Sequence, residues 1–211
     1  MSNSQPDKKT GEYVLLVDDD DALRDGIADM LRAVGYEVLC WPDSTVFLAN
    51  VPRVAPAVLI TDMRMPILSG VELHAELRRR DHWMPVIYIS GESTVAQSIL
   101  AMKLGAVDFL IKPFGREELL NAVVISIQKD RQRIHKLIQV TRVLQAQVQL
   151  SPREIQVHKL LLKGYNNSEI MSALQISLPT AKQYKSEVMR KLGVHSLSEL
   201  IALTALPTDT N

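Results

Sequence analysis

Short runs of hydrophobic residues alternate with segments of helical spacing over the first part of the chain. Five runs of four or five residues predict buried strands, namely Val14–Val17, Val38–Trp41, Ala57–Thr61, Val86–Ile89 and Val107–Ile111. Apolar residues three and four positions apart predict amphipathic helices between them, including Ala22–Val34, Gly70–Arg79 and Thr94–Leu104. Because strands and helices alternate, the pattern predicts an α/β domain with a parallel sheet covered by helices on both faces.

A long helical pattern follows this region. Residues 116–149 contain neither glycine nor proline, and their apolar residues fall near helical spacing. The last helix of the sheet domain is therefore expected to continue into a helical linker. Asp130 and Thr141 interrupt the apolar seam of that pattern. Such an interrupted seam does not establish a long coiled coil, and a loosely helical connector fits the pattern equally well.

The C-terminal part of the chain predicts four short helices. Ser151, Pro152 and Glu154 form the N-terminal capping pattern of the first helix, which is expected to end at Gly164. The other three are expected from Asn167 to about Leu174, from Leu178 to Leu192, and from Ser196 to a point before Pro207. We therefore predict an α/β domain at residues 11–128, a helical linker at 129–149 and an all-α four-helix domain at 150–206.

The two halves of the chain carry opposite formal charge. The 211 residues are neutral overall, but residues 1–128 carry a net charge of −6 and residues 129–211 a net charge of +6. The basic half makes nucleic acid a candidate partner, although chance clustering of surface charge would give the same numbers.

No feature of the sequence indicates a membrane protein. No apolar run approaches the roughly 20 residues that a membrane span needs. The polar N-terminus lacks the apolar core of a signal peptide, so we expect a cytoplasmic protein without a membrane partner. The single cysteine, Cys40, lies in an apolar run and is expected to be a small buried residue.

Polar side chains follow four of the predicted strands. Asp18, Asp62, Ser90 and Lys112 each come directly after an apolar run. Ligand sites of open α/β sheets form beyond the carboxyl ends of the strands. One edge of the sheet should therefore gather two carboxylates, a hydroxyl and an amine.

This set of groups suits phosphoryl chemistry with a divalent cation. Mg²⁺ binds one or two carboxylates together with waters and phosphate oxygens, which favours a metal role for Asp18 and Asp19. Asp20 and Asp21 are better explained as a solvated acidic helix start. Asp62 could then attack a phosphoryl group, and Lys112 could contact the phosphoryl oxygens. Pro113 is a candidate for a cis peptide bond that aims this lysine.

The ordered motifs of the first half resemble the receiver domain of two-component response regulators. They are Met63-Arg64-Met65-Pro66 after Asp62, Ser90-Gly91, Gly105-Ala106, and the run from Phe109 to Phe114 that contains Lys112-Pro113. The resemblance covers roughly Tyr13 to Ile127. It implies a flavodoxin-like (βα)₅ fold with a five-stranded parallel sheet, and a sensor histidine kinase as phosphodonor.

The same resemblance implies a role for each matching residue. Asp62 would be the phosphoacceptor and, with Asp18, Asp19 and the backbone carbonyl of Arg64, would hold Mg²⁺. Ser90 and Phe109 would form the switch pair, in which the hydroxyl moves to the phosphate and the ring turns inward. Serine replaces the commoner threonine at position 90, which keeps the hydroxyl.

The last part of the chain carries an ordered set of residues, namely Gly164, Asn167, Glu169-Ile170, Ile176-Ser177, Thr180, Lys182 and Lys191-Leu192-Gly193-Val194. With these residues the stretch from Leu150 to Leu200 resembles the LuxR-type helix-turn-helix, so the whole chain resembles the FixJ/NarL subfamily. Its recognition helix would be about Leu178–Leu192. This resemblance implies double-stranded promoter DNA as a partner, with RNA polymerase as a further candidate. We expect a homodimer in the phosphorylated state, because the DNA-binding half is small and paired recognition helices suit half-sites one helical turn apart. Candidate DNA-binding residues are Lys182, Gln183, Lys185, Ser186, Arg190 and Lys191.

The register of the recognition helix divides these candidates. Lys182 and Gln183 are expected to contact bases, with Ser186 on the same face, while Lys185, Arg190 and Lys191 hold phosphates. Three positions depart from the family pattern, with Ser168 for lysine, Ala181 for valine and Tyr184 for histidine. Site preference is expected to differ accordingly, and Tyr184 could either contact DNA or pack in the core.

Two other functions are alternatives to a phosphorylation-controlled transcriptional regulator. A haloacid-dehalogenase-like phosphatase would need an aspartate two residues after the nucleophile, where this chain has Arg64. A DNA-binding protein with a vestigial receiver is disfavoured because no residue needed for phosphorylation is missing. We expect no enzyme activity beyond self-phosphorylation and dephosphorylation of the receiver.

Overall fold

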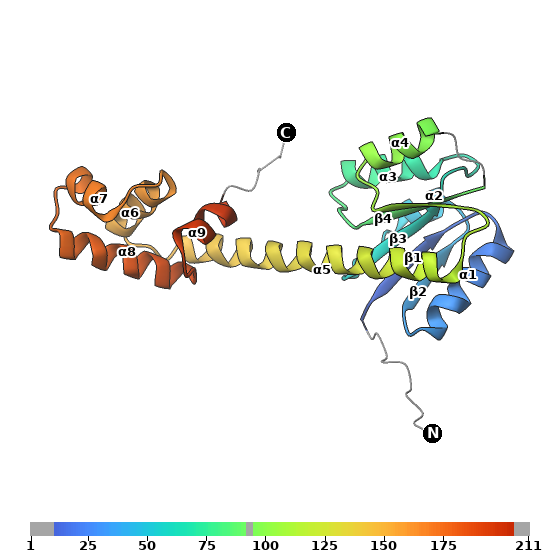
Figure 1. Ribbon diagram of the computed structural model, residues 1–211, viewed down its shortest axis with the longest axis horizontal. Coiled ribbons are helices and arrows are strands. Elements are labelled where there is room, and N and C mark those ends of the chain that lie inside the picture. Colours follow the sequence, from blue (N-terminus) through green and yellow to red (C-terminus); the bar gives the residue numbers. More distant parts are fainter. Residues whose placement is uncertain (1–10, 92–94, 205–211) are drawn as a thin grey trace, which may run out of the picture. The chain divides into compact units, whose positions relative to one another are not determined.

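The computed structural model in Figure 1 describes residues 11–91 and 95–204. The chain divides into two units after Ile134, and each is described by itself. The first residue of the helix expected from Thr94, and the residues beyond Thr204, lie outside the described part.

The first unit contains a five-stranded parallel sheet with the order β2-β1-β3-β4-β5, which confirms the predicted fold class. Strands β3 and β4 are buried along their whole length, as expected for central strands covered on both faces. The strands are β1 Tyr13–Val17, β2 Glu37–Trp41, β3 Ala57–Asp62, β4 Val86–Ser90 and β5 Asp108–Ile111.

Helices on both faces of the sheet bury two separate hydrophobic cores (Figure 1). Helices α1 and α5 contribute Ile27, Leu31, Leu119 and Val123 to one core, while α2, α3 and α4 cover the other face. The five helices are α1 Asp21–Ala33, α2 Ser44–Ala49, α3 Gly70–Arg79, α4 Val95–Lys103 and α5 Arg116–Gln147.

Side-chain caps fix where several of these helices begin. Asp20 accepts a hydrogen bond from the N–H of Leu23 at 3.0 Å at the start of α1. Asp43 caps the short helix α2, and Ser69 forms a capping box with Glu72 at α3. These caps satisfy N–H groups that have no partner within the helix and so set the point where each strand-to-helix loop ends.

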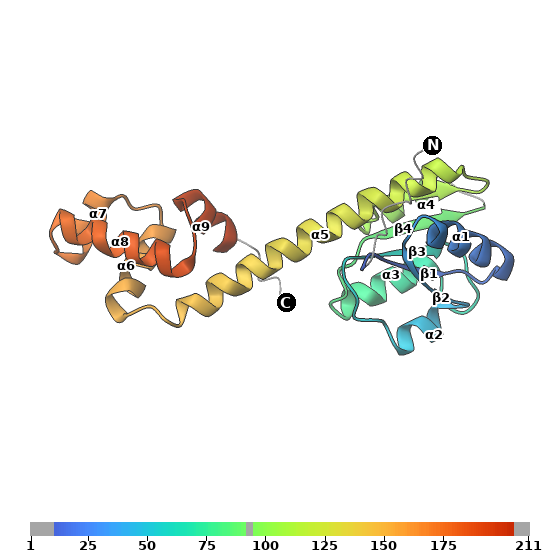
Figure 2. The same cartoon turned by 90° about the horizontal axis from the view of Figure 1, so that it is seen from below.

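Helix α5 is continuous (Figure 2), and it has 32 residues. It runs past Ile134, where the first unit ends. Of the two interpretations of the sequence, the structure contains the uninterrupted helix rather than a loose connector. Its later residues Val140, Val143 and Ala146 pack against the core of the second unit.

The second unit contains the C-terminal end of α5 and the four expected short helices. They share a core that includes Val157, Ile170, Val188 and Leu200. The helices are α6 Pro152–Leu162, α7 Asn167–Leu174, α8 Leu178–Leu192 and α9 Leu197–Thr204. Within residues 11–91 and 95–204, no helix combines the length and the apolar character needed to cross a membrane.

Candidate functional site

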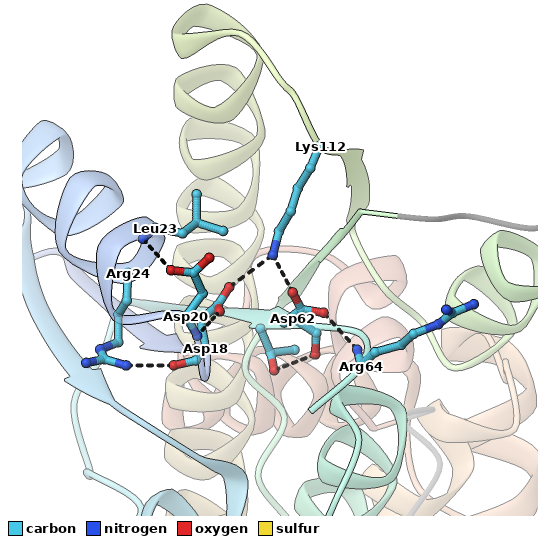
Figure 3. A network of polar contacts seen from close by, with 8 residues as sticks. Asp18, Asp20, Leu23, Arg24, Asp62, Arg64 and Lys112 are labelled. Atoms are coloured by element: carbon cyan, nitrogen blue, oxygen red, sulfur yellow. Dashed lines mark hydrogen bonds and ion pairs between the residues drawn. The ribbon is translucent and has the colours of Figure 1, made fainter. Parts of the chain in front are cut away.

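The carboxyl ends of β1, β3 and β5 bring together three charged side chains (Figure 3). The Nζ of Lys112 forms an ion pair with Oδ2 of Asp62 and lies 3.5 Å from Oδ2 of Asp18. The other carboxylate oxygen of Asp62 accepts a hydrogen bond from the backbone N–H of Arg64 at 2.8 Å. The peptide bond between Lys112 and Pro113 is cis, as expected. The predicted cluster of two aspartates and a lysine is therefore assembled.

Asp18 is the most deeply buried of the three, with no exposed surface. Its Oδ1 accepts a hydrogen bond from the N–H of Asp20 at 2.8 Å, whereas its Oδ2 has no hydrogen-bond partner among the described residues. Burial raises the pKa of Asp18, and the nearby charges of Asp62 and Asp19 add to this, while the Asp20 N–H and Lys112 oppose it. Lys112 offsets only part of the free-energy cost of burying the Asp18 carboxylate.

Lys112 itself responds to the two carboxylates. Partial burial would lower the pKa of Lys112, but its contacts with Asp62 and Asp18 outweigh that effect, and the pKa is raised. The lysine therefore stays protonated at neutral pH. It supplies a fixed positive charge beside the two carboxylates.

The backbone of Asp62 is held against the start of α3 by Gly70. A Cβ placed on Gly70 would lie 2.2 Å from the carbonyl oxygen of Asp62, a distance no side chain can accept. The N–H of Gly70 donates to the carbonyl of Met63 at 3.2 Å. Glycine at this position thus lets the loop after β3 close tightly behind the aspartate.

The remaining receiver candidates lie around this cluster. Ser90 is the last residue of β4, 1% exposed, and Phe109 in β5 is half-buried against the core on the α3 face. Ser90 is beside the end of β3 because Asp62 pairs with Ile89 in the sheet register. Asp19 is exposed directly after Asp18, and Arg64 contributes its backbone to the loop after β3.

The donor set fits a hard cation with an incomplete set of protein ligands. Within the described residues, no three or more His, Cys, Asp or Glu side chains are arranged to hold a metal by themselves. A divalent ion bound at Asp18 and Asp62 would need backbone and water oxygens as well, which is the coordination Mg²⁺ favours. The buried Oδ2 of Asp18 supports the fit, because among the described residues it has no hydrogen-bond partner and only the ion pair with Lys112 at 3.5 Å.

Helix α8 presents a second polar surface in the other unit. Lys182, Gln183, Ser186 and Arg190 are exposed on it, while Ala181, Val188 and Leu192 are buried in the core. Ser177 caps the helix by accepting from the N–H of Thr180 at 3.2 Å. Tyr184 is half-buried against the core, which favours the packing interpretation of its ring.

Two of the basic candidates already have partners within the protein. Arg190 pairs with Glu187 one turn earlier at 2.7 Å, in an exposed ion pair. Lys191 pairs with Glu154 of α6 at 2.7 Å, and Glu154 is only 6% exposed. The two lysines of the first turns, Lys182 and Lys185, are instead brought together at one cavity.

This cavity of about 370 Å³ lies beside α8 and includes residues that the sequence did not single out as contacts. It is lined by Asn167, Lys182, Lys185, Ser186, Met189, His195, Ser196 and Leu197. Asn167 begins α7, and His195 and Ser196 precede α9. No periodic pattern marks them, because they reach the surface of α8 only through the packing of the three helices.

The comparisons with known proteins agree with this arrangement of two units. Residues 14–124 match the family described as response regulator receiver domain, and residues 148–204 match bacterial regulatory proteins of the luxR family. The chain therefore belongs to the response regulators that join a receiver to a LuxR-type DNA-binding domain, which are transcriptional regulators of two-component systems rather than conventional enzymes. The predicted family is confirmed.

Individual relatives cover nearly the whole chain. The response regulator protein TodT of Pseudomonas putida is 36% identical over 191 residues, which are 90% of this chain and 84% of TodT. The transcriptional regulatory protein FixJ of Bradyrhizobium diazoefficiens is 35% identical over 195 residues, 92% of this chain and 95% of FixJ.

Two solved structures are similar to this chain over nearly its whole length. The response regulator StyR is 33% identical with a TM-score of 0.72 and covers 92% of this chain and 98% of its own. Full-length FixJ from B. japonicum, also 33% identical, has a TM-score of 0.56 and covers 91% and 95%.

Proposed function

We propose that Asp62 accepts a phosphoryl group from a sensor histidine kinase and that this phosphorylation controls binding of α8 to promoter DNA. The observation that carries the proposal is the meeting of Asp62, Asp18 and Lys112 at one edge of the sheet. We assign the receiver to residues 11–128, the linker to 129–149 and the DNA-binding domain to 150–206.

The reaction at Asp62 is a transfer between two nucleophiles. A carboxylate oxygen of Asp62 forms a bond to phosphorus as the bond from phosphorus to the kinase imidazole breaks, and the imidazole leaves. Lys112, paired with Asp62, is in place to contact an oxygen of the transferred group. Asp18, Asp19, Asp62 and the carbonyl of Arg64 would hold Mg²⁺, which neutralises charge on the phosphoryl oxygens when bound.

Ser90 and Phe109 are proposed to report the phosphorylated state. Ser90 ends the strand next to Asp62, and Phe109 lies half-buried in β5 behind it. The hydroxyl of Ser90 moves to a phosphoryl oxygen, and the ring of Phe109 turns inward. Self-phosphorylation with a small phosphodonor and later dephosphorylation use the same residues.

Labelling with acetyl phosphate in the presence of Mg²⁺ tests the receiver. Intact-mass analysis should show one added phosphoryl group on the wild type and none on Asp62→Asn. Asp43→Asn is a matched control, because Asp43 is a partly exposed aspartate that caps α2. Equal labelling of Asp62→Asn and wild type would show that the phosphoacceptor lies elsewhere.

At the DNA surface we propose that Lys182 and Gln183 contact bases, with Ser186 beside them on the same exposed face. Lys185, Arg190 and Lys191 are assigned to the phosphates. Arg190 and Lys191 must then exchange or share their contacts with Glu187 and Glu154. Of the three, Lys185 has no such ion pair among the described residues.

Binding of two variants to DNA tests this division. On a duplex that the wild type enriches from a random pool, Gln183→Ala should lose about 1–3 kcal/mol and little on random duplexes. Arg190→Ala should weaken binding to all sequences alike and reduce the salt slope by about one. A Gln183→Ala protein that weakens both duplexes equally would show that the register assigned to α8 is wrong.

We further propose that the phosphorylated protein forms a homodimer, with RNA polymerase as a later partner at the promoter. Ile99 and Met102 of α4 and Ile111 of β5 are each about half exposed, at 49%, 56% and 52%, and offer an apolar contact on the receiver. Light scattering should show a monomer before labelling and a dimer after it. An unchanged monomer, with and without DNA, would exclude the dimer.

A further inference from the structure

Asp130 is a buried carboxylate that the proposed function does not use. It is 1% exposed and lies on α5, one turn before the first unit ends at Ile134. Its position continues the buried face that α5 presents to the sheet through Val123 and Ile127. An apolar residue would satisfy that pattern, so the carboxylate must be explained by what it contacts.

The carboxylate of Asp130 is bound on both oxygens. Oδ2 accepts a hydrogen bond from the backbone N–H of Ala57 at 2.8 Å, and Oδ1 accepts from Nε of Arg133 at 2.7 Å. Ala57 is the first residue of the central strand β3 and is itself buried. A side chain of α5 therefore supplies the acceptor for the first N–H of a strand 73 positions away in the sequence.

The next residue of α5 makes a parallel contact to the neighbouring strand. Arg131 forms an ion pair with Glu12, which directly precedes β1 and is 8% exposed. Strands β1 and β3 are neighbours at the centre of the sheet. Consecutive residues of the helix thus contact the amino ends of the two strands whose carboxyl ends carry Asp18 and Asp62.

We infer that Asp130 is a positioning residue that fixes the register of α5 on the receiver at the point where the helix leaves it. Apolar side chains allow a helix to rotate or slide by small amounts, whereas a buried carboxylate has one geometry that satisfies both its donors. A change in the receiver is then passed into the rest of α5 instead of being absorbed by slippage. The inference rests on the proposed function, in which phosphorylation of Asp62 controls DNA binding.

The test compares Asp130→Leu with wild type and with Ser126→Ala. Ser126 is a matched control because it lies on the same buried face of α5, and its Oγ has no hydrogen-bond partner among the described residues. Each protein is labelled with acetyl phosphate, and affinity is measured for a duplex that the wild type enriches from a random pool. Hydrogen exchange of the Ala57 amide measures directly whether its hydrogen bond to Asp130 is present.

The expected wild-type gain in affinity on phosphorylation lies in the roughly 5–150-fold range of allosteric coupling. Asp130→Leu should label like wild type, since Asp62 lies at the carboxyl end of β3 and Asp130 contacts its amino end, but the gain in affinity should fall to about twofold or less. Exchange at Ala57 should accelerate. Ser126→Ala should keep the full gain in affinity, and hydrogen exchange at its Ala57 amide should stay slow.

An Asp130→Leu protein that keeps the wild-type gain would overturn the inference, whatever its thermal stability. If that variant does not fold, Arg133→Ala is used, since it removes one donor and leaves the bond to Ala57. A reduced gain in Arg133→Ala supports the inference, and an unchanged gain overturns it. A wild type that is not labelled, or that shows no gain, would refute the proposed function and this inference with it.

Discussion

Protonation of His74 should destabilise the receiver at acidic pH. His74 lies in α3 with no exposed surface, and its Nδ1 is 2.9 Å from the hydroxyl oxygen of Tyr88 in β4. Its Nε2 is buried without a hydrogen-bond partner among the described residues. Burial lowers the pKa of His74 from 6.5 to about 4, and the positive charge of Arg78 acts in the same direction.

The size of the effect follows from the difference between the pKa of His74 in the folded chain and its pKa in the unfolded chain. The unfolded chain binds a proton at this imidazole as the pH falls below 6.5, whereas the folded chain does so only near pH 4. The stability contributed by the neutral imidazole is complete above the first value and declines as the pH falls towards the second. Linkage gives a loss of about 2 kcal/mol between about pH 7 and about pH 5.

Urea unfolding followed by tryptophan fluorescence measures this loss in the receiver alone, because Trp41 and Trp83 are the two tryptophans of the chain and both lie in the first unit. His74→Asn keeps a polar atom near Tyr88 but does not titrate. Between about pH 7 and about pH 5 it should lose about 2 kcal/mol less than wild type. Other titrating groups cancel in that difference.

The control is His82→Asn, which changes a partly exposed imidazole of the same unit and should behave like wild type. Equal losses in wild type and His74→Asn would refute the argument that His74 is held neutral by burial.

Gly70→Ala should destabilise the receiver by about 1–3 kcal/mol and slow acetyl phosphate labelling, because its Cβ would lie 2.2 Å from the Asp62 carbonyl oxygen. Gly26→Ala, in an open position of α1, should instead stabilise it by about 0.5–1 kcal/mol, and urea unfolding that shows the same sign for both would contradict this. Lys191→Ala should cost about 1–3 kcal/mol because it leaves the buried Glu154 without its cation, and faster hydrogen exchange in α6 would detect this. Glu187→Ala removes an exposed partner and should cost less than about 1 kcal/mol, so equal exchange in both variants would count against a structural role for Lys191.

Most of what the sequence predicted about the receiver came from the residues at the ends of the predicted strands. The apolar run before Asp62 predicted Ala57–Thr61, and the strand is Ala57–Asp62. Because parallel strands end at the same edge, polar residues after the runs could be placed together without knowing any distance. The helix Gly70–Arg79 was predicted with the bounds it has, since its cap and its apolar spacing are both local.

Contacts that depend on distant packing could not be predicted in this way. Asp130 was interpreted only as a break in an apolar seam, because its partner Ala57 is brought to it by the fold of the whole unit. Lys191 was assigned to DNA from its place on α8, whereas its pairing with Glu154 requires α6 to pack alongside. The cavity beside α8 likewise combines residues from three helices and a loop.

The strand order also determines when Asp18, Asp62 and Lys112 can meet during synthesis. Strand β1 lies between β2 and β3, and β5 is at the edge of the sheet beyond β4. Asp18 and Asp62 therefore meet as soon as β3 has paired, while Lys112 arrives only with the last strand. In a chain in which β5 has not yet paired, the two carboxylates would lie near each other without Lys112. Helix α5, which contributes Leu119 and Val123 to one of the two cores, follows Lys112 in the chain, so the charge cluster and that core would be completed by the same last part of the receiver.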